Sequence, residues 1–111
     1  MEQAWIMVCK THEISSYSGM SAFVLGRQVA IFRVSSDFYA ISDFDPFSGA
    51  YVLSRGMVEK HKGVVKVGSP NYGKSFNLAT GECLEDPSVK LPTYPTRVVG
   101  EVLQISLQKG P

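Results

Sequence analysis

The sequence has no long hydrophobic run and almost no excess of either charge. Its 111 residues include 11 basic and 10 acidic side chains, and the basic ones form no stripe that would attract a nucleic-acid backbone. No stretch approaches the roughly 20 apolar residues that cross a bilayer, and the N-terminus lacks the basic start and apolar run of a secretory signal. These features predict a cytoplasmic protein with protein partners and without nucleic-acid or membrane partners.

Cysteine and histidine are equally scarce, with two of each. Cys9 and Cys83 lie in a chain without a cysteine-rich framework, so we expect free thiols packed as small apolar groups. Cys9 and His12 have Cys-x-x-His spacing, but no second close pair completes a metal site. We therefore expect Cys9 to end a buried strand, His12 to lie in a solvated turn and His61 to lie in a solvated loop.

Recognisable catalytic motifs are also missing. No Gly-x-Gly-x-x-Gly follows a strand to receive a dinucleotide, and no Gly-x-Ser-x-Gly elbow presents a nucleophile. Neighbouring carboxylates such as Asp43 and Asp45, or Glu82, Glu85 and Asp86, lie within reach of loops, but acidic loop residues are usually solvated and nothing forces them together. We expect no catalytic, cofactor-binding or metal-binding residue in this chain.

Short apolar-polar alternations separated by turn residues fill most of the chain. This pattern is typical of an all-β domain in which antiparallel strands bury one face, and 44% apolar content in 111 residues is enough for one core. The sequence predicts one domain over 1–111, with its core at about 5–107. The expected strands are 5–8, 21–25, 29–34, 38–41, 63–67, 76–78, 82–84, 96–99 and a last strand after Gly100-Glu101 that contains Leu103, Ile105 and Leu107.

Turn chemistry refines this interpretation. Gly26-Arg27 is expected to form the two-residue turn of the first hairpin because glycine adopts positive φ without strain. Ser35-Ser36 and Thr80-Gly81 are expected to form further turns. Helix is limited to possible turns at 12–16 and 50–54.

Two loops carry the most informative residues. Asp45-Pro46-Phe47 follows the strand at 38–41, and Ser69-Pro70-Asn71-Tyr72-Gly73 follows the strand at 63–67. A Rieske centre binds its irons through a Cys-x-His loop and a Cys-Pro-x-His-Gly loop, with two thiolates on one iron and two imidazoles on the other. The four ligand positions of that pattern fall here on Asp45, Phe47, Ser69 and Tyr72.

The surrounding segments agree with this alignment. Leu53-Ser54-Arg55-Gly56 follows the first loop, and the segment 76–82 reads Phe-Asn-Leu-Ala-Thr-Gly-Glu. In order and spacing the chain resembles Rieske-like domains, and among them most closely the small subunit of assimilatory NAD(P)H-dependent nitrite reductase, a family with the Rieske fold but no cluster. The resemblance implies an all-β Rieske-like (iron-sulfur protein, ISP) fold of stacked antiparallel sheets or a small barrel. Aspartate, serine and phenylalanine are poor ligands for a cluster iron, so we interpret the domain as cluster-free.

The same resemblance implies a function. The chain would be the non-catalytic small subunit of an oxidoreductase that reduces nitrite to ammonium in nitrate assimilation. The large-subunit partner would carry FAD, an iron-sulfur cluster and sirohaem. Two alternatives remain: a stand-alone, cluster-free interaction or ligand-binding module, and a small ferredoxin-like electron carrier for an oxygenase, which the residues at 45, 47, 69 and 72 disfavour.

The resemblance brings the two loops together at one tip rich in aromatic side chains. Phe47 and Tyr72 are expected to fill the space left by a cluster. Alternatively, Phe47, Tyr51, Arg55 and Tyr72 provide a surface that docks on the large subunit, because exposed aromatic and arginine side chains make good interface anchors. Asp45 is expected to be a turn residue that bonds a nearby backbone amide.

Overall fold

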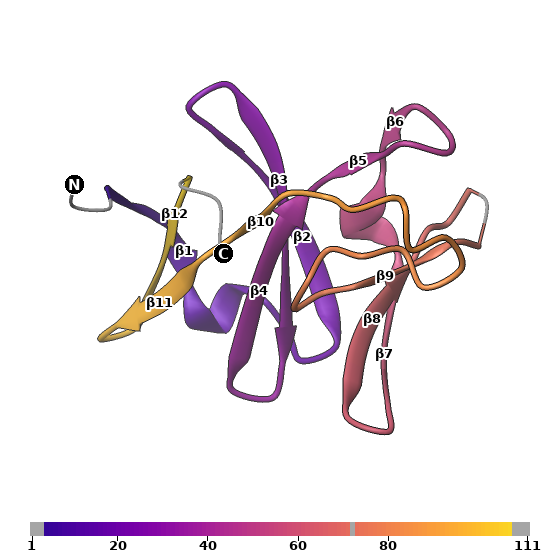
Figure 1. Ribbon diagram of the computed structural model, residues 1–111. Helices are drawn as coiled ribbons and strands as arrows, with labels where there is room; N and C mark the ends of the chain where they lie inside the picture. Colours follow the sequence, from indigo (N-terminus) through magenta and orange to yellow (C-terminus); the bar gives the residue numbers. More distant parts are fainter. Residues whose placement is uncertain (1–3, 72, 108–111) are drawn as a thin grey trace.

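The chain folds into short antiparallel strands arranged in several small sheets (Figure 1). The computed structural model describes residues 4–71 and 73–107. Within these ranges helical structure is limited to two short 3-10 turns, which confirms the expected all-β fold with little helix. The elements are β1 (Trp5–Lys10), η1 (Thr11–Glu13), β2 (Ser18–Val24), β3 (Arg27–Val34), β4 (Asp37–Ser42), β5 (Phe44–Asp45), β6 (Ala50–Tyr51), η2 (Leu53–Arg55), β7 (Met57–His61), β8 (Val64–Gly68), β9 (Ser75–Asn77), β10 (Thr93–Tyr94), β11 (Thr96–Val99) and β12 (Val102–Ser106).

Two sheets form one half of the molecule, which we call the base. One sheet has the order β10-β4-β3-β2 and the other the order β1-β12-β11. Their facing residues make an apolar cluster that includes Ile31, Leu103 and Ile105, each with no exposed surface. Because alternate residues of β12 point inward, Leu103 and Ile105 are buried as the alternation predicts.

The other half contains the sheet β7-β8-β9 and the two-stranded ribbon β5-β6. The sheet β10-β4-β3-β2 lies between this half and the strands β1 and β12 (Figure 1). A second apolar cluster joins this half to the base. Phe32 of β3, Leu53 of η2, and Val67 and Phe76 of β8 and β9 belong to it, and all four are fully buried. The loops that follow β5 and β8 are therefore held on a packed support.

The hairpin turns differ in one case from their sequence-based prediction. Val24 pairs with Arg27, so the two-residue turn of the first hairpin is Leu25-Gly26 and the predicted Gly26-Arg27 turn is wrong by one position. Both turn residues have positive φ, at 46° and 82°, which suits the right-handed twist of a two-residue hairpin. Arg27 can then pair in β3, which also explains why this strand begins two residues earlier than predicted.

One further strand prediction and one loop prediction need correction. Residues 82–84 form no strand; only isolated bridges pair Cys83 with Phe76 and Glu82 with Lys90. His61 was predicted to lie in a loop but ends β7, because it pairs with Val64 of β8. His61 is nevertheless exposed, as expected. The final hairpin is confirmed, with Val99 opposite Val102 around Gly100-Glu101.

None of the helical segments in the described part of the chain has the length and apolarity that crossing a bilayer requires.

Candidate functional site

Asp45 is the last residue of β5 and starts the first loop. Its side chain has no exposed surface. Oδ1 accepts a 2.9 Å hydrogen bond from the backbone amide of Phe47, and Oδ2 accepts one of 3.0 Å from the Ser48 hydroxyl. The backbone oxygen of Asp45 also accepts from the Gly49 amide at 2.8 Å, which closes the turn. Asp45 therefore has the predicted turn geometry.

Ser69 follows β8 and starts the second loop. Its amide donates to the Lys74 oxygen at 2.8 Å, and its own backbone oxygen accepts from the Gly73 amide at 3.2 Å. The side chain is 5% exposed. Its hydroxyl donates a 2.5 Å hydrogen bond to Oδ2 of Asp45. The structure thus brings positions 45 and 69 into direct contact.

The environment of Asp45 favours its charged form. Burial raises the pKa of this carboxyl, but hydrogen bonds from the Ser69 hydroxyl, the Phe47 amide and Ser48 outweigh that effect and bring the pKa below its ordinary value. A carboxylate that accepts several hydrogen bonds gains more from them when ionised than when protonated. At neutral pH the two loops therefore meet around a buried negative charge.

Phe47 lies against the second apolar cluster, the one that contains Phe76, rather than free in solvent. It is half-buried and packs on that cluster, with its ring centroid 6.2 Å from that of Phe76. The Lys74 ammonium lies 5.6 Å from the Phe47 ring centroid. Tyr72 lies outside the described residues.

Tyr51 and Arg55 lie on the surface. The Tyr51 side chain is 54% exposed, and its ring contacts that of Phe44 at 5.1 Å between centroids. Arg55 ends η2, and its side chain is exposed. Of the three proposed docking residues that the structure describes, Tyr51 and Arg55 expose their side chains to solvent, while Phe47 is largely used for internal packing.

Asp43 was expected to be a solvated loop residue like other acidic residues, and this expectation is wrong. It has no exposed surface. Oδ1 accepts from the Ser54 amide at 2.6 Å, and Oδ2 accepts from the Gln28 side-chain amide at 2.7 Å. Asp43 therefore ties η2 to β3 of the base. The one available signal was its position two residues before Asp45, which puts both carboxyls near the same loop.

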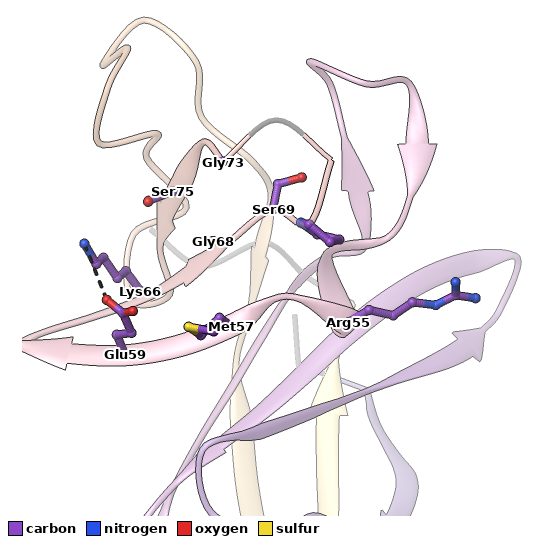
Figure 2. A pocket seen from close by; sticks show the side chains of 9 residues that line it. Arg55, Met57, Glu59, Lys66, Gly68, Ser69, Gly73 and Ser75 are labelled. Carbon is purple, nitrogen blue, oxygen red and sulfur yellow. Dashed lines mark ion pairs between the residues drawn. The ribbon is translucent and has the colours of Figure 1, made fainter.

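An open hollow of about 440 Å³ lies beside the second loop, over the outer face of β7, β8 and β9 (Figure 2). Gly68 of β8 pairs with Met57 of β7 on one side and with Ser75 of β9 on the other. Because Gly68 has no side chain, the space between these two neighbours is left open. The Lys66 ammonium and the Glu59 carboxylate on this face are 3.9 Å apart, while the end of the Arg55 side chain points away from the other labelled residues (Figure 2). The lining residues are Arg55, Met57, Glu59, Lys66, Gly68, Ser69, Pro70, Gly73 and Ser75.

The residues in the two loops do not fit a [2Fe-2S] cluster. Phe47 has no lone pair for a metal, and the oxygens of Asp45 and Ser69 already bond each other. Cluster irons are held by thiolate sulfur and, in Rieske centres, imidazole nitrogen. In residues 4–71 and 73–107, no group of three or more His, Cys, Asp or Glu side chains has an arrangement suited to a metal ion.

The cysteines and His12 lie elsewhere. Cys9 is half-buried in β1 and has a free thiol; Cys83 is also free and 1% exposed, within the apolar cluster. Burial and the nearby Glu13 carboxylate raise the pKa of Cys9. His12 is exposed in η1. The cysteine environments agree with packing roles for both thiols.

Comparison with known proteins adds a family to this geometry. Residues 4–106 match the family described as the Rieske-like [2Fe-2S] domain. The chain is 41% identical over 103 residues to the nitrite reductase (NADH) small subunit of Salmonella typhimurium, an alignment that covers 91% of this chain and 95% of that protein.

Two other comparisons extend the match. The solution structure of the Escherichia coli protein NirD superimposes with a TM-score of 0.88 at 37% identity, covering 96% of this chain and 99% of that one. The large subunit of the nitrite reductase [NAD(P)H] of Klebsiella oxytoca contains a stretch 31% identical over 94 residues, which is 85% of this chain but 10% of that protein. The chain therefore belongs to the Rieske-like domain family and, within it, to the small subunits of NADH-dependent nitrite reductase.

Proposed function

We propose that this chain is the non-catalytic, cluster-free small subunit of a cytoplasmic NAD(P)H nitrite reductase that serves nitrate assimilation. The observation that carries the proposal is 41% identity to a nitrite reductase small subunit along nearly the whole of both chains, together with Asp45, Phe47 and Ser69 at positions where a Rieske centre needs cysteine or histidine. Reduction of nitrite to ammonium would take place on a large subunit that holds FAD, an iron-sulfur cluster and sirohaem.

In this proposal the small subunit acts through its shape and its surface. The Asp45 and Ser69 side chains are buried and bonded to each other, so the loops offer packed support rather than an electron-transfer centre. This chemistry also argues against the oxygenase ferredoxin, because such a carrier needs a redox centre of its own.

We further propose that Tyr51 and Arg55 contact the large subunit. Tyrosine and arginine are enriched among residues that dominate binding energy. Tyr51 is exposed and its ring is already held against Phe44, which reduces the side-chain freedom lost on binding. Phe47 and Tyr72 complete the proposed docking set. Phe47 contributes by packing the first loop, to which it belongs, against the apolar cluster beneath it.

The test is reconstitution with the large subunit encoded in the same genome. The tagged small subunit should retain a flavin- and sirohaem-containing protein, and adding it to the separated large subunit should restore nitrite-dependent NAD(P)H oxidation. The purified chain alone should be colourless and contain no iron. Co-purification of no coloured partner, with no effect on activity, would favour the stand-alone module; bound iron and a visible spectrum would favour the ferredoxin.

The docking residues are tested with the same complex. Tyr51→Ala and Arg55→Glu should each weaken binding by about tenfold or more if they are anchors. Lys62→Glu is the matched control, because it reverses an exposed charge on the β7-β8 turn, away from both loops. Equal affinity for all three variants would place the docking surface elsewhere without affecting the subunit assignment.

A further inference from the structure

The side chains of residues 45 and 69 contact each other directly, whereas in a Rieske centre the residues at these two positions are joined by an iron ion. In the Rieske pattern both positions are cysteines, and their sulfurs bind the same iron. Here the Ser69 hydroxyl donates directly to Oδ2 of Asp45 at 2.5 Å. The chain therefore has a direct link between the two loops at the point where the pattern has a bridging metal.

Each of the two side chains is also bonded within its own loop. Asp45 accepts from the Phe47 amide at 2.9 Å, and Ser69 Oγ accepts from the Asn71 amide at 3.3 Å. In both cases the donor is the amide two residues further along. The result is one continuous series of hydrogen bonds from the backbone of the first loop to the backbone of the second.

Burial makes this series strong. Asp45 has no exposed surface and Ser69 is 5% exposed, so water does not compete for their hydrogen bonds. Bonds to an ionised acceptor are shorter and about twice as strong as those between neutral groups, and a low local dielectric strengthens them further. A single carboxylate can therefore supply a substantial part of the energy that holds the loops together.

We propose that the Asp45-Ser69 hydrogen bond is a polar latch that replaces the metal centre in joining the two loops. The latch fixes the turn after β5 against the loop after β8, while the base depends on its own apolar cluster. Breaking the latch opens the two loops locally and leaves the base folded. This inference concerns the isolated chain and does not depend on the proposed large-subunit partner.

Other contacts between the loops define what the latch adds. Lys74 lies over the Phe47 ring, and Phe47 packs on Phe76. These contacts involve only the Phe47 ring, so they do not depend on the hydrogen bonds of Asp45. They keep the loops near one another after the latch is broken, so its loss appears as faster opening rather than as unfolding.

The experiment is amide hydrogen exchange measured by NMR on the isolated chain and on the variants Asp45→Asn, Ser69→Ala and the double variant. Each single variant should exchange about tenfold faster or more at the loop amide whose own acceptor it keeps, which is Phe47 in Ser69→Ala and Asn71 in Asp45→Asn, because the bond between the two loops is lost. Exchange at Ile31 and Ile105 in the base should stay unchanged. The double variant should exchange no faster than the faster single variant, because both substitutions break the same bond.

The matched control is the Asp86-Ser88 pair. The Ser88 hydroxyl donates to Oδ1 of Asp86 at 2.6 Å, and the Ser88 amide donates to the same oxygen at 3.2 Å, within one exposed turn. Asp86→Asn and Ser88→Ala should speed exchange only in that turn and leave Phe47 and Asn71 unchanged.

Three results would overturn the latch. One is unchanged exchange at Phe47 in Ser69→Ala and at Asn71 in Asp45→Asn. Another is an increase of the same size at Ile31 and Ile105, which would mean general destabilisation. The third is multiplication of the single effects in the double variant, which would mean that the residues act separately. Should Asp45→Asn not fold, Ser69→Ala decides the same question, because it keeps the carboxylate and its bonds to Phe47 and Ser48.

Discussion

The side-chain amide of Gln28 donates a 2.7 Å hydrogen bond to Oδ2 of Asp43. This contact links the middle of the base to the residue at which the chain leaves it for the two loops. The other oxygen of the same buried carboxyl accepts from the Ser54 amide. Asp43 is therefore a polar anchor between the halves, beside the apolar contacts of the cluster that includes Leu53.

Replacing Asp43 should destabilise the whole protein. Asp43→Ala leaves the partly buried Gln28 side chain and Ser54 amide without their acceptor, and a hydrogen bond to a charged group contributes about 1.5–3 kcal/mol. We expect the free energy of unfolding in urea to fall by about 3 kcal/mol. Asp37→Ala, at an exposed position at the start of β4, is the control and should change it little. Similar stability of the two variants would show that the anchor contributes nothing.

The contribution of Asp45 to stability should depend on pH in a defined direction. Its pKa is lower in the folded chain than its ordinary value of about 3.9. A group whose folded-state pKa is lowered contributes its full stability above the unfolded pKa and loses it as the pH falls through the folded value. The stability difference between the unmodified chain and Asp45→Asn should thus be constant from about pH 5 to 7 and shrink below about pH 4. A difference that grows in acid would contradict the assigned direction.

Gly81 and Gly63 provide a comparison between backbone strain and steric collision. Their φ angles are +82° and +81°, but a Cβ on Gly81 would collide with the Leu91 carbonyl oxygen, while one on Gly63 would meet open space. Gly63→Ala should cost about 1–2 kcal/mol of left-handed strain. Gly81→Ala should cost that plus about 1–3 kcal/mol of overpacking. Urea unfolding of the two variants measures the difference, and equal losses would refute the collision.

The single tryptophan reports on the outer face of the sheet β1-β12-β11. The Arg97 guanidinium lies 4.4 Å from the Trp5 ring centroid, and its Nε donates to the Gln104 side chain at 2.7 Å. Arg97→Ala uncovers the indole, so its fluorescence emission should shift to longer wavelength, with a loss of about 0.5–1 kcal/mol of stability. Arg55→Ala, on the other half of the molecule, should leave the emission unchanged. An unchanged spectrum in Arg97→Ala would show that the contact does not persist in solution.

The two thiols should differ in reactivity. Cys83 is 1% exposed, and Cys9 is half-buried. Reactive thiols need both access and ionisation, and the raised pKa of Cys9 slows its reaction as well. Iodoacetamide at neutral pH should therefore modify Cys9 slowly and Cys83 only after unfolding in urea, as followed by peptide mass spectrometry. Faster modification of Cys83 in the native chain would contradict its position in the apolar cluster.

Local patterns in the sequence predicted much of the fold. The alternation of Leu103, Ile105 and their polar neighbours predicted the last hairpin, and Ser35-Ser36 predicted the turn before β4. The turn at Leu25-Gly26 was misplaced because leucine rarely adopts positive φ. There the pairing of β2 with β3 determines the register, and a single-residue preference does not override it.

The loops were predictable in part. The turn role of Asp45 follows from its own sequence neighbourhood, and the structure confirms it. Its bond to Ser69 joins residues far apart in the chain, and no local pattern indicates which distant hydroxyl a buried carboxylate will meet. Asp43 was missed for the same reason, because its partner Gln28 belongs to a strand of the base.

The pairing of β1 with β12 has a consequence for how this domain is carried in proteins. Trp5 lies opposite Ser106, so the polypeptide enters and leaves the fold at neighbouring points, on the side away from β5, β6 and the loop after β8 (Figure 1). A longer polypeptide can hold the domain as a cassette between two flanking segments, with both junctions on one side and the opposite end unobstructed. The Klebsiella oxytoca large subunit, in which a similar stretch makes up a tenth of the length, shows that a stretch of this kind also occurs within a longer polypeptide.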